Sequence, residues 1–422
     1  MRALLAILPL LLVASAAEAE LRGHGGPVRA LAIAGDGGLA VSGSFDSRAI
    51  VWDLAKGAAA RVLRLHDGSV NAVAFLADGR IVTGGEDGRI ALWPHNGGEP
   101  ERVEAAHTSQ IVGFALSSDG TRLASASWDG TARIAPLAGG EARVLTGHLG
   151  QVNAVAFAPD GAIVTAGYDA TLRIWPEDGG PARIVQTGSP LNALAIAPDG
   201  EIVVGAADGH VRVLTPGGEI RAEIEIQRLP VIALALSPDG ERIAAASIRG
   251  SVSVIDRASG TVDFVLVGPG LPVWSVAFDP DGRTLLTGGG DAVVRRWDAR
   301  TGEHIGPVMM GGGADPLARF TGSRGAEVFR ACAACHTLSE DEGERAGPTL
   351  AGIFGRRIGT AEGYDFSPAL REMDIVWTPQ TVAELFEFGP TAYTPGSKMP
   401  EQRIPSEADR RALVEFLEEV TR

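Results

Sequence analysis

The chain has 422 residues, enough for two or three domains, and its 56 glycines, 45% hydrophobic residues and 5% aromatic residues suit a β-rich fold with many turns. Its 37 lysines and arginines are outnumbered by 52 aspartates and glutamates. The resulting net charge of −15 excludes a basic surface for nucleic acid and disfavours attraction to anionic membranes.

The N-terminus, MRALLAILPLLLVASAAEAE, carries one arginine, then an apolar run, then small residues. Ala17-Glu18-Ala19 is an A-x-A cleavage sequence, so residues 1–19 are predicted to be a secretory signal peptide, with cleavage after Ala17 as an alternative. The run is shorter than the ~20 residues that a membrane-spanning helix needs, which argues against an uncleaved anchor. No other stretch is long and apolar enough, so we expect a periplasmic mature chain without a transmembrane span.

The next three hundred residues repeat one pattern seven times. An Asp-Gly turn returns every 39 to 42 residues, beginning at Asp36-Gly37 and ending at Asp281-Gly282. Each turn lies between two alternating segments, such as VNAVAFAPDG and AIVTAG, and further segments such as TLRIWP and ARVLTG follow. Asp-Gly between alternating apolar runs indicates a hairpin, because the turn needs positive φ. The pattern therefore predicts four strands in each repeat.

The third strand of several repeats ends in IVWD, RIWP or RRWD, and Gly-His dipeptides occur at Gly23-His24 and Gly147-His148. These repeats resemble the WD-repeat β-propeller family. The resemblance implies an all-β propeller of seven blades over residues 20–310, since one repeat cannot bury its own faces and a ring of seven can. We expect residues Glu303–Met310 to supply the last strand of blade seven.

The histidines of the repeats belong to a pattern of that family, in which a His, an Asp and a Trp form a structural hydrogen-bond network inside a blade. Three repeats match it in full, with His24, Asp46 and Trp52, with His66, Asp87 and Trp93, and with His148, Asp169 and Trp175. The third has His107, Asp129 and Ala135, the fifth keeps Asp208, and the seventh keeps Asp291 and Trp297. The resemblance therefore assigns these residues to structure rather than to catalysis.

The pattern ends at a short glycine-rich linker, residues 311–317, and residues 318–422 are predicted to form a small all-α domain. The segment GAEVFRACAACH has apolar residues at helical spacing up to the two cysteines. Ser406–Val420 is a second predicted helix, and Ser406 with Asp409 makes a capping start for it.

The chain's two cysteines, Cys332 and Cys335, are followed at once by His336. Cys-x-x-Cys can be a redox dithiol, half of a zinc site or an attachment site for haem. A thioredoxin-like dithiol needs a βαβ context that this region lacks, and zinc needs further ligands that the sequence does not offer. Cys-x-x-Cys-His is the spacing for a covalent c-type haem.

The segments around this motif, GAEVFRACAACH, GPTLAGIFGRR, GTAEGYDFSPAL and YTPGSKMP, resemble the class I cytochrome c family over residues 318–422. The resemblance implies one covalent haem c on Cys332 and Cys335, with His336 as the proximal iron ligand and Met399 as the distal one. It also implies that the carbonyl of Pro348 accepts a hydrogen bond from the proximal histidine.

The same resemblance implies that Arg356 and Trp377 contact a haem propionate, and it gives Met373 no ligand role. The sequence departs from the family at Leu385 and Leu370, where a tyrosine and an asparagine are common, and at Phe366, a common tyrosine. We expect these changes to make the haem pocket more apolar.

The predicted function is that of a one-electron carrier with a His/Met-ligated haem, whose propeller is a docking platform for proteins. Its partners are expected to be one or more redox proteins and a protein bound at the propeller. An alternative is an oxidoreductase with a cofactor or substrate site in the propeller and the cytochrome as electron exit. A third hypothesis is a haem peroxidase or sensor in which Met399 leaves the iron.

Overall fold

The computed structural model describes residues 20–268, 271–305, 317–330, 332–339, 345, 347–362, 364, 366–397, 399 and 402–421. The predicted signal peptide, residues 1–19, and residues 311–316 of the predicted linker lie outside these ranges. Within the described ranges, no helix has the length and apolar character needed to cross a membrane.

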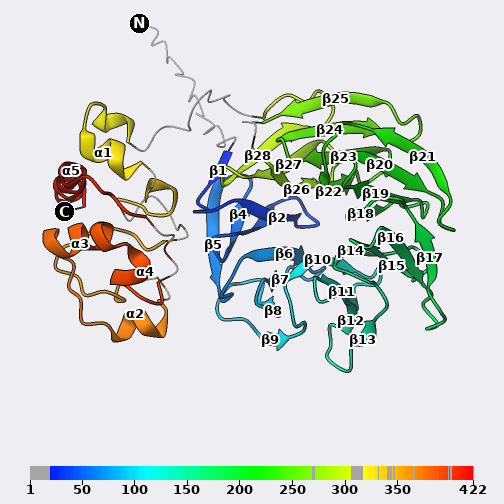
Figure 1. The fold of residues 1–422 in the computed structure, drawn as a ribbon, viewed down its shortest axis with the longest axis horizontal. Coiled ribbons are helices and arrows are strands. Elements are labelled where there is room, and N and C mark those ends of the chain that lie inside the picture. Colours follow the sequence, from blue (N-terminus) through cyan, green and yellow to red (C-terminus); the bar gives the residue numbers. More distant parts are fainter. Residues whose placement is uncertain are drawn as a thin grey trace, which may run out of the picture.

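Seven four-stranded antiparallel sheets form a ring (Figure 1), which confirms the seven-bladed propeller. Blade one contains β2 (Val28–Ile33), β3 (Leu39–Ser44), β4 (Arg48–Asp53) and β5 (Ala58–Arg64). Blade two contains β6 (Val70–Phe75), β7 (Ile81–Gly85), β8 (Arg89–Trp93) and β9 (Arg102–Ala105). Blade three contains β10 (Ile111–Leu116), β11 (Arg122–Ser127), β12 (Ala132–Pro136) and β13 (Arg143–Leu145).

Blade four contains β14 (Val152–Phe157), β15 (Ile163–Gly167), β16 (Thr171–Trp175) and β17 (Arg183–Gln186). Blade five contains β18 (Leu191–Ile196), β19 (Ile202–Ala206), β20 (His210–Leu214) and β21 (Ile220–Glu225). Blade six contains β22 (Val231–Leu236), β23 (Arg242–Ser247), β24 (Ser251–Asp256) and β25 (Val262–Val267). Blade seven contains β26 (Val273–Phe278), β27 (Thr284–Gly289), β28 (Val293–Asp298) and β1 (Glu20–Arg22).

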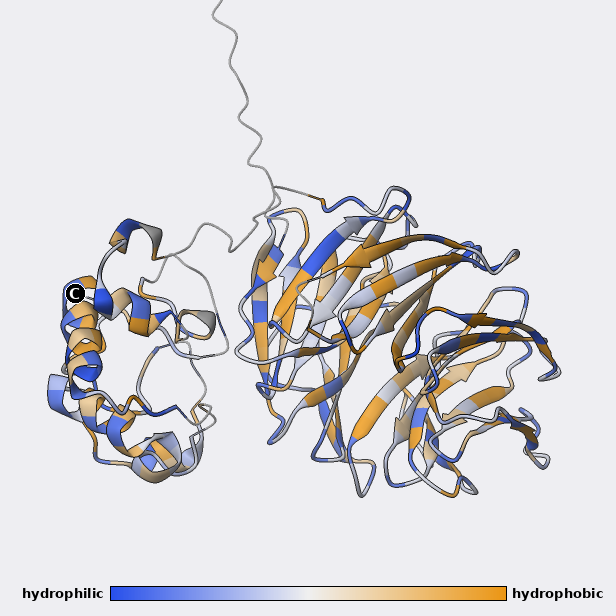
Figure 2. Cartoon of the chain, turned by 45° about the horizontal axis from the view of Figure 1, so that its top comes forward, coloured by the Kyte–Doolittle hydropathy of each residue, from blue (hydrophilic) through white to orange (hydrophobic). Residues whose placement is uncertain are grey.

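The second strand of a blade is packed on both faces by its neighbours, so it reads as a continuous apolar or small run rather than an alternating one. In β7, every residue of the sequence IVTGG is buried. A Cβ on Gly84 would lie 2.6 Å from the Phe114 ring of blade three, so only glycine allows this approach. The outer strand β5 instead alternates between exposed and more buried residues along most of its length. Figure 2 shows hydrophobic residues along the strands of the ring and hydrophilic residues in many connecting loops.

The ring closes with an N-terminal strand, so the prediction that Glu303–Met310 supplies the last strand of blade seven is wrong. β1 pairs with β28, with Leu21 opposite Val294, and Leu21 is fully buried. Glu20 adds an ion pair to Arg295 at 3.3 Å. His304 forms an isolated bridge to Trp297 rather than part of a strand, and residues 306–310 lie outside the described ranges. A strand from the other end of the chain closes the ring because it joins the first and last blades without leaving a free edge.

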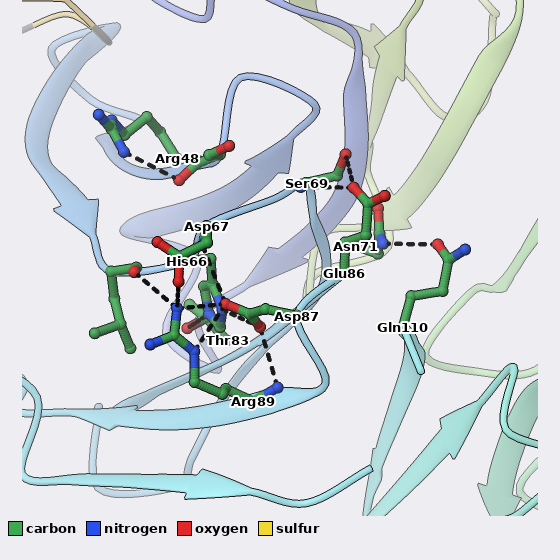
Figure 3. A network of polar contacts seen from close by, with 12 residues as sticks. Arg48, His66, Asp67, Ser69, Asn71, Thr83, Glu86, Asp87, Arg89 and Gln110 are labelled. Atoms are coloured by element: carbon green, nitrogen blue, oxygen red, sulfur yellow. Dashed lines mark hydrogen bonds and ion pairs between the residues drawn. The ribbon is translucent and has the colours of Figure 1, made fainter. Parts of the chain in front are cut away.

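The predicted His-Asp-Trp networks are present and include a hydroxyl that connects their members. Figure 3 shows the one in blade two, where His66 Nδ1 lies 3.0 Å from Asp87 and His66 Nε2 lies 2.8 Å from the hydroxyl of Thr83. Trp93 donates its ring N–H to the same hydroxyl at 2.9 Å. Every polar atom of this buried chain is paired when Nδ1 carries the proton, which supports the structural assignment.

The C-terminal region is helical, as predicted. It contains α1 (Arg324–Phe329), α2 (Pro368–Glu372), α3 (Pro379–Phe388), α4 (Pro390–Tyr393) and α5 (Glu407–Val420), with single 3₁₀ turns at Ala318–Phe320 and Cys332–Ala334. The N-cap of α5 is Ser406, whose side chain accepts a hydrogen bond from the backbone of Asp409. α1 crosses α5 at Gly325, where any Cβ would overlap the carbonyl of Ala412.

The helical region lies beside blade one of the propeller (Figure 1) and contacts it. Arg48 of β4 donates to the hydroxyl of Tyr364 at 3.1 Å, and Arg64 of β5 donates to the carbonyl of Arg345 at 3.1 Å. The Arg64 guanidinium also lies over the Tyr364 ring, 4.5 Å from its centroid. These contacts bring the first propeller blade against the segment that carries the two cysteines.

Candidate functional site

A cavity of about 470 Å³ lies within the helical region and extends to blade one. Its volume falls in the ~300–1,000 Å³ range of cofactor and ligand sites. All four predicted site residues, Cys332, Cys335, His336 and Met399, line this cavity. The fold therefore brings together residues that are up to 67 positions apart in the chain.

The cysteines and the histidine share one tight turn after α1. The backbone N–H groups of Cys335 and His336 both donate to the carbonyl of Cys332, at 3.1 and 3.0 Å. This turn explains the spacing of the motif, because it places two thiols and an imidazole against the same cavity.

His336 is held by the segment that follows it. Gly347 donates to the carbonyl of Cys335 at 2.8 Å, and Leu350 donates to the carbonyl of Thr337 at 2.9 Å. This pairing places the Pro348 carbonyl 2.8 Å from His336 Nδ1, the hydrogen bond that the sequence predicted. With its proton on Nδ1, the imidazole has Nε2 free to bind a metal. Burial lowers the pKa of His336 and so favours the neutral ring that a metal requires.

Cys332 is buried, Cys335 is partly buried, and neither thiol is activated. Burial raises the pKa of Cys332 to about 11 and the pKa of Cys335 to about 12. Redox-active and nucleophilic cysteines have lowered pKa values instead. The environment of these thiols therefore does not resemble that of a dithiol oxidoreductase.

The loop between α4 and α5 carries the predicted distal ligand. Of the two described methionines, Met399 lines the cavity, whereas Met373, which ends α2, does not. The Met399 N–H donates to the hydroxyl of Ser397 at 3.1 Å, and Ile404 donates to the carbonyl of Phe386 at 2.8 Å. The first bond fixes the local turn before the thioether, and the second anchors the loop to α3 after it.

The remaining wall of the cavity is largely apolar. The residues that depart from the family pattern, Phe366, Leu370 and Leu385, all line it. Arg356 and Trp377 line it as well, and Trp377 donates its backbone N–H to the Arg356 carbonyl at 3.0 Å. Arg356 directs its guanidinium to the carbonyls of Thr349 and Ala351, at 2.8 and 2.9 Å, which fixes its position.

Sequence reasoning missed the part of the wall that belongs to the propeller. Gly25, Asp46, Arg48 and Arg64 line the cavity together with the helical residues. Gly25 lies so close to Cys335 that a Cβ would overlap its sulfur atom. A repeat pattern cannot reveal this contact, because it depends on how two separately folded regions pack.

The donor set fits a covalently attached haem. Two thiols are available for thioether bonds, a neutral imidazole for the iron, a thioether for its opposite face, and arginines for the carboxylates of the macrocycle. The apolar walls would surround the ring and keep water away from it.

Comparison with known proteins agrees with this reading of both regions. Residues 322–421 match the cytochrome c family. The WD domain, G-beta repeat family matches residues 16–53, 57–94, 98–134, 139–176, 182–214 and 260–298, which together exceed half of the chain. The unmatched stretch between residues 214 and 260 contains three strands of blade six, which lacks the His, Asp and Trp signature.

Curated relatives match the helical region. The chain is 40% identical to cytochrome c of Stellaria longipes over 100 residues, which is 24% of this chain and 92% of that protein. It is 39% identical to cytochrome c of Arabidopsis thaliana over 110 residues, which is 26% of this chain and 97% of that protein. The likeness therefore covers nearly the whole of these relatives and about a quarter of this chain.

Proposed function

Because the chain belongs to the WD-repeat family through its propeller and to the cytochrome c family through its last hundred residues, we propose that it is an exported one-electron carrier with a docking propeller. The cytochrome c domain carries a covalently bound haem c. We assign its thioether bonds to Cys332 and Cys335 and its axial ligands to His336 and Met399. The observation that carries this assignment is the convergence of all four side chains on one cavity.

The bound haem would supply transfer of single electrons. The residues around it would restrict it to electron transfer by denying oxygen and peroxide access to the iron. The Pro348 carbonyl holds His336 in one tautomer. Met399 would fill the position opposite the imidazole, so that neither oxygen nor peroxide finds an open site. The apolar wall of Leu370 and Leu385 excludes water, so that little reorganises when the charge changes.

The propeller supports a role in binding proteins. Its loops carry exposed aromatic side chains at Phe45, Trp128 and Tyr168. A small cavity between blades six and seven has about 10 Å³, close to the ~10–15 Å³ that one water needs. The exposed aromatic side chains, of a kind enriched in protein interfaces, favour a binding surface over the alternative of a catalytic propeller.

Export to the periplasm is part of the proposal and rests on residues 1–19 and on the haem motif. Attachment of a c-type haem takes place outside the cytoplasm, where a secretory signal would deliver the chain. Recovery of the mature protein from a periplasmic fraction, with its N-terminus sequenced, tests this directly. Haem-loaded protein that stays in the cytoplasm with residues 1–19 still attached would contradict it.

The ligation is tested by replacing Met399 with alanine in the full-length haem protein. We expect the wild type to show a low-spin spectrum and a methionine–iron charge-transfer band when oxidised. Met399→Ala should lose that band, become high-spin and bind carbon monoxide, because the sixth position opens. Met373→Ala is the matched control and should leave the spectrum unchanged. A charge-transfer band that survives in Met399→Ala would overturn the assignment.

A further inference from the structure

Arg48 is a buried cation at the contact between the two domains. It begins β4 of blade one, and its residue is only 4% exposed. The guanidinium lines the cavity of the helical domain, with one nitrogen 3.1 Å from the hydroxyl of Tyr364. A second nitrogen lies 3.4 Å from the Ser47 carbonyl, at the limit of a hydrogen bond, and Nε has no partner.

No carboxylate of the described residues forms an ion pair with this guanidinium. Asp46, on the same wall, directs its oxygens to His24 at 2.9 Å and to the backbone N–H groups of Gly25 and Arg48 itself. Asp67, on the same wall, pairs with Arg89 at 2.6 Å. Neither forms an ion pair with the Arg48 guanidinium. An arginine cannot lose its proton in a protein, and a buried charge without a partner is costly.

The cavity that Arg48 lines is lined by several arginines, which favour binding of an anion. Arginines on the wall come from both domains, with Arg48 and Arg64 from the propeller and Arg356 and Arg357 from the helical domain. A haem carries two carboxylates, and a guanidinium pairs with a carboxylate through parallel hydrogen bonds. A haem carboxylate would thus supply the direct ionic partner that the carboxylates of the described wall, such as Asp46 and Asp67, do not give to Arg48.

We propose that Arg48 of the propeller pairs with a carboxylate of the haem, so that the propeller completes the haem site of the other domain. This inference rests on the proposed haem site and goes beyond it, because it gives the propeller a direct electrostatic role at the cofactor. In this arrangement the propeller is both a platform for partners and one wall of the redox centre.

The pairing has a definite effect on the reduction potential. Oxidation adds one positive charge at the iron, and a buried guanidinium nearby opposes that charge, as does neutralisation of a haem carboxylate. Arg48 should therefore favour the reduced state and raise the potential. Because the group is buried, added salt should screen this effect only weakly.

The test is the midpoint potential of full-length haem protein carrying Arg48→Met, which removes the charge and keeps much of the side-chain length. We expect the reduction equilibrium to shift about tenfold towards the oxidised state, which is about 59 mV lower for one electron. Arg48→Lys keeps the charge and should fall between wild type and Arg48→Met. Arg300→Met removes an exposed arginine of blade seven and should leave the potential unchanged.

Each variant is first checked for an unchanged visible spectrum and thermal unfolding, so that a misfolded protein is recognised and the proposed axial ligation is judged separately. Equal potentials for wild type and Arg48→Met would overturn the pairing, as would equal shifts in Arg48→Met and Arg48→Lys. A wild-type potential that depends on phosphate at constant ionic strength would assign Arg48 to a solution anion instead and overturn it too.

Discussion

Gly347 shows how one residue without a side chain fixes the axial imidazole. A Cβ at this position would lie 2.5 Å from His336 Cε1 and 2.8 Å from Nδ1, so the ring packs directly on the backbone. The same residue donates to the Cys335 carbonyl and thereby sets the position of Pro348. The orientation of the predicted iron ligand thus depends on a glycine that carries no chemistry of its own.

We predict that Gly347→Ala displaces His336 and costs about 1–3 kcal/mol through overpacking. The haem protein should show a mixture of low-spin and high-spin absorption, because the bond from His336 to the iron and its hydrogen bond to Pro348 are both strained. Gly35→Ala is the control, since a Cβ there meets no atom within 4 Å. An unaltered spectrum in Gly347→Ala would show that the ring can move aside freely.

At the scale of the element, a chain of side-chain hydrogen bonds connects the first three strands of a blade. It runs from the loop before the first strand to the second and third strands and the turn between them. In blade four, His148 Nε2 lies 2.8 Å from the Thr165 hydroxyl, which also accepts the Trp175 ring N–H at 2.9 Å. His148 Nδ1 lies 3.0 Å from Asp169. Blade six lacks these residues, so its strands are held by the backbone ladder and by apolar packing.

These networks make the propeller's stability depend on pH. Burial lowers the pKa of both His148 and His107, against the opposing effect of their aspartate partners. Burial alone would raise the pKa of Asp169, but hydrogen bonds from Leu149, Thr171 and His148 outweigh it and lower the pKa to about 2. The unfolded chain binds protons more readily than the folded one in both cases, so stability rises with pH.

We predict that the unfolding temperature of the propeller falls on acidification, first as the pH drops below about 6.5, the usual pKa of histidine, and again between about pH 4 and pH 2 through Asp169. His148→Gln should be less stable at pH 7 but should show a flatter dependence between pH 7 and pH 5. Gly35→Ala, which alters no titratable group and adds a methyl group that meets no atom within 4 Å, should keep the wild-type slope. Tryptophan fluorescence during heating measures the unfolding temperature of the wild type and of both variants at each pH. The same slope of unfolding temperature against pH in wild type and His148→Gln would contradict the prediction.

At the scale of the whole molecule, the propeller covers the cysteine-bearing turn of the cytochrome domain. Gly25 lies against Cys335 without room for a side chain, and Arg48 and Arg64 contact Tyr364 from the adjoining strands. A redox partner therefore meets this part of the haem site only through the propeller or after the two domains separate. Because this chain has a net charge of −15, a partner that presents a basic surface is attracted to it and one that presents an acidic surface is repelled.

We predict that Gly25→Ala forces the domains apart at this contact, because the added methyl group would overlap the sulfur of Cys335. Reduction by a small reagent such as ascorbate should become faster, measured by stopped-flow absorbance, and the segment before β2 should become more sensitive to protease. Gly35→Ala again serves as the control, since it adds the same methyl group in open space. Unchanged reduction and proteolysis would mean that the contact yields without opening.

The sequence by itself determined what depends on local spacing. Asp-Gly turns at a regular period predicted the seven blades, and the pair of cysteines with His336 predicted a haem site, because turns and ligand sets are written within a few residues. Even the hydroxyl of each network was readable in principle, since Ser42, Thr83 and Thr165 all precede their tryptophans by ten residues. The roles of Cys332, Cys335, His336 and Met399 stay predictions, now placed around one cavity.

Only the tertiary structure decided what depends on segments far apart in the chain. β1 closes blade seven because its three residues fit the free edge of β28, a match of backbone geometry that the composition of Glu303–Met310 did not reveal. The cavity gains Arg48 from a strand 351 positions before Met399 because the two domains pack together. Such contacts depend on how the surfaces of folded elements fit together, and no local pattern in the sequence encodes that fit.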